Sequence, residues 1–207
     1  MNAATVTPLR RPAAEPPVRL LIVPGLHGSG PGHWQSWLEQ AHPGSVRIAL
    51  DDWGQADLGR WAAAIDEVLQ TQRAEAWVAV AHSFGCLALA RHAAQGGRGI
   101  HGALMVAPAN PDRFLLDEHP ISQPLPFAST LVVSANDPWM SHADALYFGQ
   151  RWGSAIVEVG EAGHINTAAG YGAWPEAQAW VAQHVQRVAS TLRPRAVKAA
   201  PALGFAV

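Results

Sequence analysis

The chain has 207 residues, of which 49% are hydrophobic and only 14% are charged, and its formal net charge is −2. This length suits one domain, and the hydrophobic content is enough for a large buried core. The low and nearly balanced charge argues against a nucleic-acid-binding protein, which usually carries a basic patch, and against an acidic disordered chain. No apolar run is long enough to predict a membrane span.

The two ends of the chain differ in composition from its middle. Residues 1–17 are rich in Ala and Pro, and we expect a flexible lead there; residues 193–207 contain two prolines and no helical period, and we expect a flexible tail. Residues 18–192 are expected to form the single domain. The first residues lack the apolar stretch of a secretory signal, although two arginines weakly resemble a transit peptide. The single cysteine, Cys86, cannot form an internal disulfide, so we expect a reducing, cytoplasmic location.

Short apolar runs alternate with helical patterns along the domain. The runs that predict strands cover residues 19–23, 45–50, 76–81, 102–107, 130–135 and 155–160. The helical patterns cover residues 32–40, 56–70, 84–95, 141–152 and 174–190. The apolar runs are rich in Val, Ile, Leu and Ala and hardly alternate with polar residues, which is typical of parallel strands buried on both faces. This order predicts an α/β fold, a three-layer α/β/α sandwich around a mostly parallel six-stranded sheet.

A serine lies at the turn between the third predicted strand and the helix after it. Residues 81–85 read Ala-His-Ser-Phe-Gly, which is close to the G-x-S-x-G pattern of a nucleophile elbow. So sharp a turn needs small residues two positions before and after the serine. Gly85 meets this requirement, and Ala81 departs from the usual glycine by one methyl group. Ser83 could instead cap the following helix, but the strand before it and the helix after it favour a nucleophile.

A serine hydroxyl needs a base, and the base needs an acid to orient it. In this arrangement the acid precedes the histidine in the chain. Asp137 follows the fifth predicted strand and His164 follows the sixth. Asp137 could simply cap the next helix, and His164 could be an exposed loop residue. Their types, order and positions nevertheless favour a triad of Ser83, His164 and Asp137, with Asp112 and Asp117 as alternative acids.

Two backbone N–H groups should stabilise the oxyanion. One belongs to Phe84, and the other should come from the glycine-rich loop after the first strand, where we predict Leu26 with His27 as the alternative. This loop has neither the G-x-G-x-x-G pattern nor a Walker lysine, so no nucleotide site is expected. The histidines show no zinc-protease spacing, and we therefore expect no metal and no cofactor.

Loops near the predicted triad supply candidate substrate-binding residues. Besides Phe84 they are His27, Trp34, Asn110, Trp139 and Met140. Aromatic side chains there favour an apolar acyl or side-chain group, although most of the nine tryptophans are expected to lie in the core. Only residues 108–127 could cover the site. An open or shallow pocket for a small substrate is therefore expected.

Several motifs together resemble one known family. They are VPGLHGSGPGHWQSWL at 23–38, the elbow at 81–85, ANDPW at 135–139 and GHIN at 163–166, within a resemblance that runs from about residue 19 to about residue 188. The chain resembles the small serine hydrolases of the retinoblastoma-binding protein nine family. The resemblance implies an α/β-hydrolase fold without a large lid, and it implies catalytic roles for Ser83, Asp137 and His164. It also places His33-Trp34 near the mouth of the site.

The resemblance leaves the substrate open, because esterase and aminopeptidase-like activities both occur in that family. The L-x-C-x-E motif that binds the retinoblastoma protein is absent from this chain, so that partner is not expected. We expect a serine hydrolase that cleaves a small ester or amide through an acyl-enzyme, without a nucleic-acid or membrane partner. The alternative is a catalytically idle protein-interaction module that keeps the fold, which the complete set of triad residues argues against.

Overall fold

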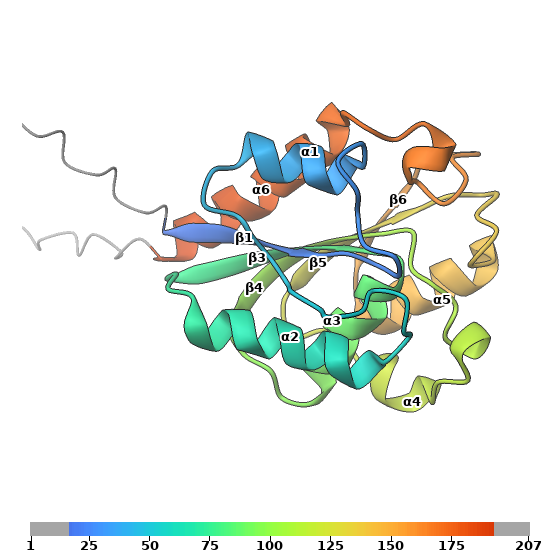
Figure 1. The fold of residues 1–207 in the computed structure, drawn as a ribbon, viewed down its shortest axis with the longest axis horizontal. Coiled ribbons are helices and arrows are strands. Elements are labelled where there is room, and N and C mark those ends of the chain that lie inside the picture. Colours follow the sequence, from blue (N-terminus) through green and yellow to red (C-terminus); the bar gives the residue numbers. More distant parts are fainter. Residues whose placement is uncertain (1–16, 193–207) are drawn as a thin grey trace, which may run out of the picture.

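A six-stranded sheet forms the centre of the computed structural model, which describes residues 17–192 (Figure 1). The strands are β1 (Val18–Val23), β2 (Val46–Arg47), β3 (Ala76–His82), β4 (Ile100–Val106), β5 (Ala128–Val133) and β6 (Ala155–Glu158). They are ordered β2-β1-β3-β4-β5-β6, and every neighbouring pair is parallel. The predicted α/β class and six-stranded sheet are confirmed. The lead and tail expected at the two ends fall outside the described residues, apart from Pro17.

Five helices form where the sequence predicts them: α1 (Trp34–Ala41), α2 (Leu58–Thr71), α3 (Phe84–Ala94), α5 (His142–Trp152) and α6 (Pro175–Leu192). Helix α4 (Glu118–Ile121) and the short 3₁₀ helices η1 (Pro111–Phe114) and η2 (Thr167–Ala169) were not predicted. Local capping explains where several of the helices begin. The Asp57 carboxylate accepts the Arg60 N–H at the start of α2, and the Ser141 hydroxyl accepts the Asp144 N–H at the start of α5.

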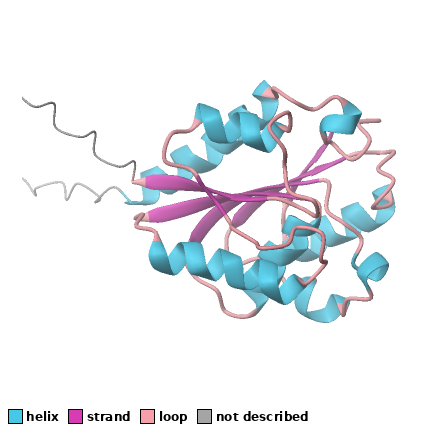
Figure 2. Cartoon of the chain, viewed as in Figure 1, coloured by secondary structure: helices cyan, strands magenta, loops and turns pink. Residues whose placement is uncertain are grey.

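The helices cover both faces of the sheet and create two separate cores (Figures 1 and 2). Helices α1 and α6 pack on one face, and α2, α3 and α5 pack on the other. Successive strand residues point to opposite faces, so Leu21 enters one core and Ile22 the other. On α2, Trp61, Ile65 and Val68 recur at helical spacing and are buried against the sheet. The three-layer arrangement follows from these two periodicities.

The second strand is shorter than the predicted residues 45–50. It lies at the edge of the sheet and pairs only with β1, through Val46 and Arg47. Ile48 still donates its N–H to the carbonyl of Ile22 and is buried, but the chain leaves the sheet after Ile48 and is exposed at Asp51. The apolar run at 45–50 therefore predicted the presence of this edge strand but not the residue at which it ends.

The order of the strands decides where a site can form. The chain first moves from β1 outward to β2, then crosses back to β3 on the other side of β1. The connections on either side of this reversal diverge, and in open parallel sheets a crevice forms there at the carboxyl ends of the strands. This edge lies opposite the start of β1 and the end of α6 (Figure 1). Among residues 17–192, no helix combines the length and apolar character needed to cross a membrane.

Candidate active site

Ser83 occupies a strained turn between β3 and α3. Its backbone has φ 54° and ψ −124°, a conformation that residues with a side chain rarely adopt. The turn is possible because glycines occupy two crowded positions beside it, Gly85 in the elbow and Gly25 in the loop after β1. A Cβ atom on Gly85 would overlap the carbonyl oxygen of Val23, and a Cβ atom on Gly25 would lie 2.7 Å from the Ser83 Cβ. Ala81, where glycine is usual, is fully buried in the core.

A continuous chain of hydrogen bonds links Ser83, His164 and Asp137. The Ser83 Oγ lies 2.8 Å from His164 Nε2, and both carboxylate oxygens of Asp137 lie 2.9 Å from His164 Nδ1. A carboxylate can only accept, so Nδ1 carries the imidazole proton and Nε2 is free to accept the serine hydroxyl. The side chains of His164 and Asp137 are 9% and 3% exposed. Asp137 also accepts the Trp139 N–H at 2.8 Å, which fixes its orientation.

The loops that carry Asp137 and His164 are bonded to each other. Asn136 Oδ1 accepts the Gly163 N–H at 2.7 Å, Ser134 Oγ accepts the Ala162 N–H at 3.0 Å, and the Ala135 N–H donates to the Gly160 carbonyl at 2.7 Å. These cross-links follow two neighbouring parallel strands, β5 and β6. They hold the carboxylate and the imidazole at a fixed separation, which sequence reasoning did not anticipate.

The alternative acids lie elsewhere. Asp117 caps α4 by accepting the His119 N–H. Asp112 lies in η1 and borders a separate hollow, whose lining also includes Glu118 and Asp144. Of the three predicted acids, the structure therefore brings only Asp137 to His164.

The two predicted oxyanion donors belong to the loop after β1 and to the start of α3. An ideal Cβ on Gly25 would be 3.2 Å from the Phe84 nitrogen, so the first loop runs directly against the start of α3. His27, the alternative donor, gives its N–H to the Trp53 carbonyl at 2.8 Å. Within the described residues, neither Leu26 nor Phe84 donates its N–H to a protein acceptor. These two groups remain the candidates for an oxyanion hole.

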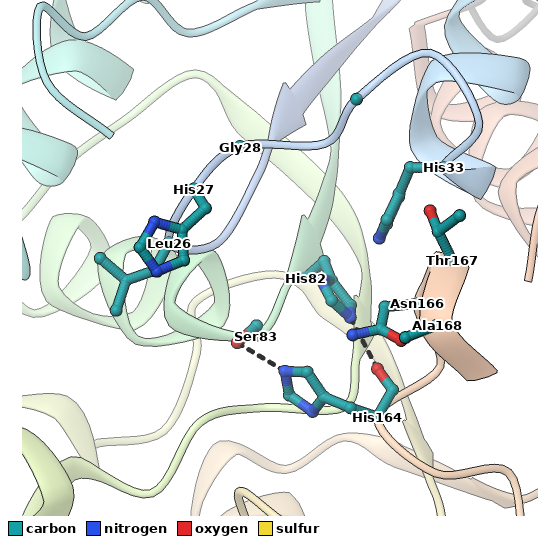
Figure 3. A pocket seen from close by; sticks show the side chains of 11 residues that line it. Leu26, His27, Gly28, His33, His82, Ser83, His164, Asn166, Thr167 and Ala168 are labelled. Atoms are coloured by element: carbon teal, nitrogen blue, oxygen red, sulfur yellow. Dashed lines mark hydrogen bonds between the residues drawn. The ribbon is translucent and has the colours of Figure 1, made fainter. Parts of the chain in front are cut away.

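A pocket of about 250 Å³ opens beside Ser83 (Figure 3). It lies between the loop after β1, the elbow and the segment that follows His164. Its lining consists of Leu26, His27, Gly28, Gly30, His33, His82, Ser83, His164, Asn166, Thr167 and Ala168. None of these residues is an aspartate, glutamate, lysine or arginine, so the lining mixes polar and apolar surface and carries no permanently charged side chain. Residues 108–127, the only segment that could have covered the site, contribute no lining residue and contain only η1 and α4 as helices.

The predicted substrate-binding residues divide into two groups. His27 lines the pocket, and the half-exposed Trp139 lies with its ring centroid 6.1 Å from that of His164. Trp34 is fully buried and donates its indole N–H to the Ile165 carbonyl at 2.9 Å. Met140 is buried in the core, and Asn110 borders the separate hollow near η1. The structure therefore gives Trp34 a supporting position beneath the histidine loop, with Met140 and Asn110 outside the pocket.

Two buried histidines for which no chemical role was predicted, His82 and His33, line the pocket. His82 donates from Nε2 to the His164 carbonyl at 3.0 Å, and its ring centroid is 5.0 Å from that of His164. Burial, followed by the nearby His164 and His33, lowers the pKa of His82 well below its usual value. Burial, followed by the charge of Arg47 and by His164, lowers the pKa of His33 to about 4. Both rings are therefore neutral near pH 7.

The sequence contains only weak indications that His82, His33 and Asn166 belong to the site. His82 directly precedes the nucleophile, His33 belongs to a motif placed near the mouth of the site, and Asn166 follows His164 by two positions. Nothing in their spacing shows which way their side chains point. Among residues 17–192, no group of three or more His, Cys, Asp or Glu side chains is arranged to hold a metal ion.

Comparisons with known proteins agree with this architecture. A YdeN-like hydrolase from Pectobacterium atrosepticum is 40% identical, with a TM-score of 0.79 over 83% of this chain and 92% of that one. The ydeN gene product of B. subtilis is 20% identical, with a TM-score of 0.68 over 81% of this chain and 98% of that one. Est1E from Butyrivibrio proteoclasticus, solved with ferulic acid, is 10% identical, with a TM-score of 0.64 over 86% and 90%. The two lower identities show the fold alone.

No curated protein matches the sequence significantly. The family model described as serine hydrolase matches residues 20–183, which is most of the domain. This match agrees with the α/β-hydrolase architecture, the strained serine turn and the resemblance seen in the sequence motifs. The chain belongs to the serine hydrolase family.

Proposed function

We propose that this chain cleaves a small carboxylic ester or amide through an acyl-enzyme formed on Ser83. The observation that carries the proposal is the unbroken hydrogen-bond chain from Ser83 through His164 to Asp137. The strained backbone at Ser83 supports it as well. Such strain costs on the order of 1–3 kcal/mol and persists where the surrounding structure holds the residue for a function.

Each residue then has one task. His164 Nε2 takes the hydroxyl proton as Ser83 Oγ attacks the carbonyl carbon, and the carbonyl oxygen becomes an oxyanion held by the Leu26 and Phe84 N–H groups. Asp137 holds the imidazole in the required tautomer and stabilises the imidazolium. The imidazolium gives its proton to the leaving group as the bond to that group breaks. A water molecule then attacks the acyl-enzyme by the same route, which releases the acid and restores Ser83.

The size and lining of the pocket favour a small, uncharged substrate. Its volume of about 250 Å³ is near the lower end of ligand sites, and its lining holds no carboxylate to pair with a substrate ammonium group. These features favour a short ester over an aminoacyl amide with a free amino terminus. The alternative, an idle interaction module, predicts an unreactive serine, so a test of the reactivity of Ser83 distinguishes it from the proposal.

A fluorophosphonate probe provides the test, because it labels an activated serine. The wild-type chain should be labelled, Ser83→Ala should not be, and the matched variant Ser190→Ala, which changes an exposed serine on α6, should be labelled like wild type. Rates on a nitrophenyl ester and on an aminoacyl nitroanilide then compare the two substrate classes. Labelling of Ser83→Ala at the wild-type level would reject Ser83 as the nucleophile, and an unlabelled wild type would support the idle module.

A further inference from the structure

His33 has one ring nitrogen that is bonded and one that is not. The ring is 5% exposed, and its Nδ1 accepts the Gln35 N–H at 3.1 Å as the N-cap of α1. Because Nδ1 accepts a hydrogen bond and the ring is neutral, the proton must be on Nε2. Within the described residues, this buried Nε2 has no hydrogen-bond partner. His33 therefore presents a neutral N–H donor that no acceptor of the protein satisfies.

The donor belongs to the pocket beside Ser83. His33 lines this pocket, and in Figure 3 its ring extends from the start of α1 with a nitrogen at the tip. Asn166 lines the same pocket, and its Oδ1 accepts the Ala169 N–H at 3.1 Å. This bond leaves the amino end of Asn166 for a ligand. A buried donor without a partner destabilises a protein, and a substrate that brings an acceptor recovers that loss on binding.

We propose that His33 Nε2–H, together with the Asn166 amide, forms a donor subsite that selects uncharged esters with a second hydrogen-bond acceptor besides the scissile carbonyl. An ether or carbonyl oxygen has the required chemistry. A carboxylate is disfavoured because the lining supplies no cation to neutralise it. The inference rests on the proposed ester hydrolysis and adds a preference within it.

Pairs of esters that differ by one CH₂→O replacement test the preference. On the acyl side, nitrophenyl methoxyacetate is compared with nitrophenyl butanoate; on the alcohol side, 2-methoxyethyl acetate is compared with butyl acetate. The measured quantity is the ratio of kcat/KM for the oxygen-containing ester to that for its hydrocarbon partner. Dividing by the same ratio for hydroxide-catalysed hydrolysis removes intrinsic reactivity. In the wild type the corrected ratio should exceed one by about three- to tenfold in at least one arm, the gain of one hydrogen bond.

Two substitutions of His33 separate the donor from the helix cap. Asn can keep the capping acceptor near the backbone but does not reach the position of Nε2, whereas Gln can reach that position but gives a poorer cap. His33→Asn should lower the ratio about three- to tenfold in the arm that shows the preference. His33→Gln should keep most of the ratio while lowering the melting temperature more than His33→Asn does.

The outcomes are distinguishable. A loss in the acyl arm places the acceptor on the acid side of the substrate, and a loss in the alcohol arm places it on the leaving group. A corrected ratio near one in the wild type would overturn the donor subsite. An equal loss of the ratio in His33→Asn and His33→Gln would overturn it as well. If a variant fails to fold, the wild-type ratio alone still tests the donor subsite. A chain that cleaves none of the four esters would refute the ester hydrolysis itself.

Discussion

Mild acid should destabilise this protein through its buried neutral histidines, and His33 is where the effect can be measured. Its pKa of about 4 in the folded chain lies below the usual 6.5. Between these values the unfolded chain binds a proton at this position and the folded chain does not. The contribution to stability is therefore full above about pH 6.5 and is lost as the pH falls toward about 4.

The size of the effect follows from linkage. Each pH unit in this window costs about 1.4 kcal/mol, so His33 should account for about 2 kcal/mol of the stability lost between about pH 7.5 and about pH 5. His33→Asn removes the titrating group while it can keep the cap of α1. The free energy of unfolding of the variant should therefore fall by about 2 kcal/mol less than that of the wild type over this range.

Urea denaturation at both pH values measures this difference. His101→Asn is the matched control, because it makes the same chemical change at an exposed position on β4. It should leave the pH dependence within about 0.5 kcal/mol of the wild type. If His33→Asn also keeps the wild-type pH dependence within that margin, His33 is not a buried neutral ring, and the argument for its Nε2–H donor fails with it.

Three further predictions concern the site. Asp137→Asn should lower turnover of a nitrophenyl ester roughly 10⁴-fold by leaving His164 in the wrong tautomer, whereas Asp112→Asn should leave it near the wild-type rate; the reverse order of effects would move the acid to the earlier loop. Wild-type kcat/KM should rise with pH across about pH 5 to 8, where histidine side chains change charge, and a profile controlled near pH 4 would point to a carboxylate base. Gly85→Ala should lower the free energy of unfolding by about 3 kcal/mol or more because its methyl overlaps the Val23 carbonyl, whereas Gly30→Ala meets open space and should change it little; equal melting temperatures of the two variants would contradict the close approach.

Local periodicity was enough to predict the layers of this fold. Unbroken apolar runs and helical patterns reflect burial along each segment, which a sequence records directly. The elbow was also predictable, because only small residues fit beside a strained serine, and Gly85 shows this requirement in the sequence. The end of β2 was not predictable, since it depends on how far the edge strand can follow β1.

The sequence by itself determined the α/β class, the order of its elements and the residues that could act as nucleophile, acid and base. Only the tertiary structure shows that Asp137, and not Asp112, lies against His164, because bonds between two loops bring Asp137 there. It also placed Trp34 beneath the histidine loop instead of in the pocket, through a contact 131 residues away in the chain. The direction of the His33 Nε2–H group also depends on the tertiary structure. Side-chain direction and long-range contact depend on how distant segments pack, and the spacing of residues along a chain does not record that.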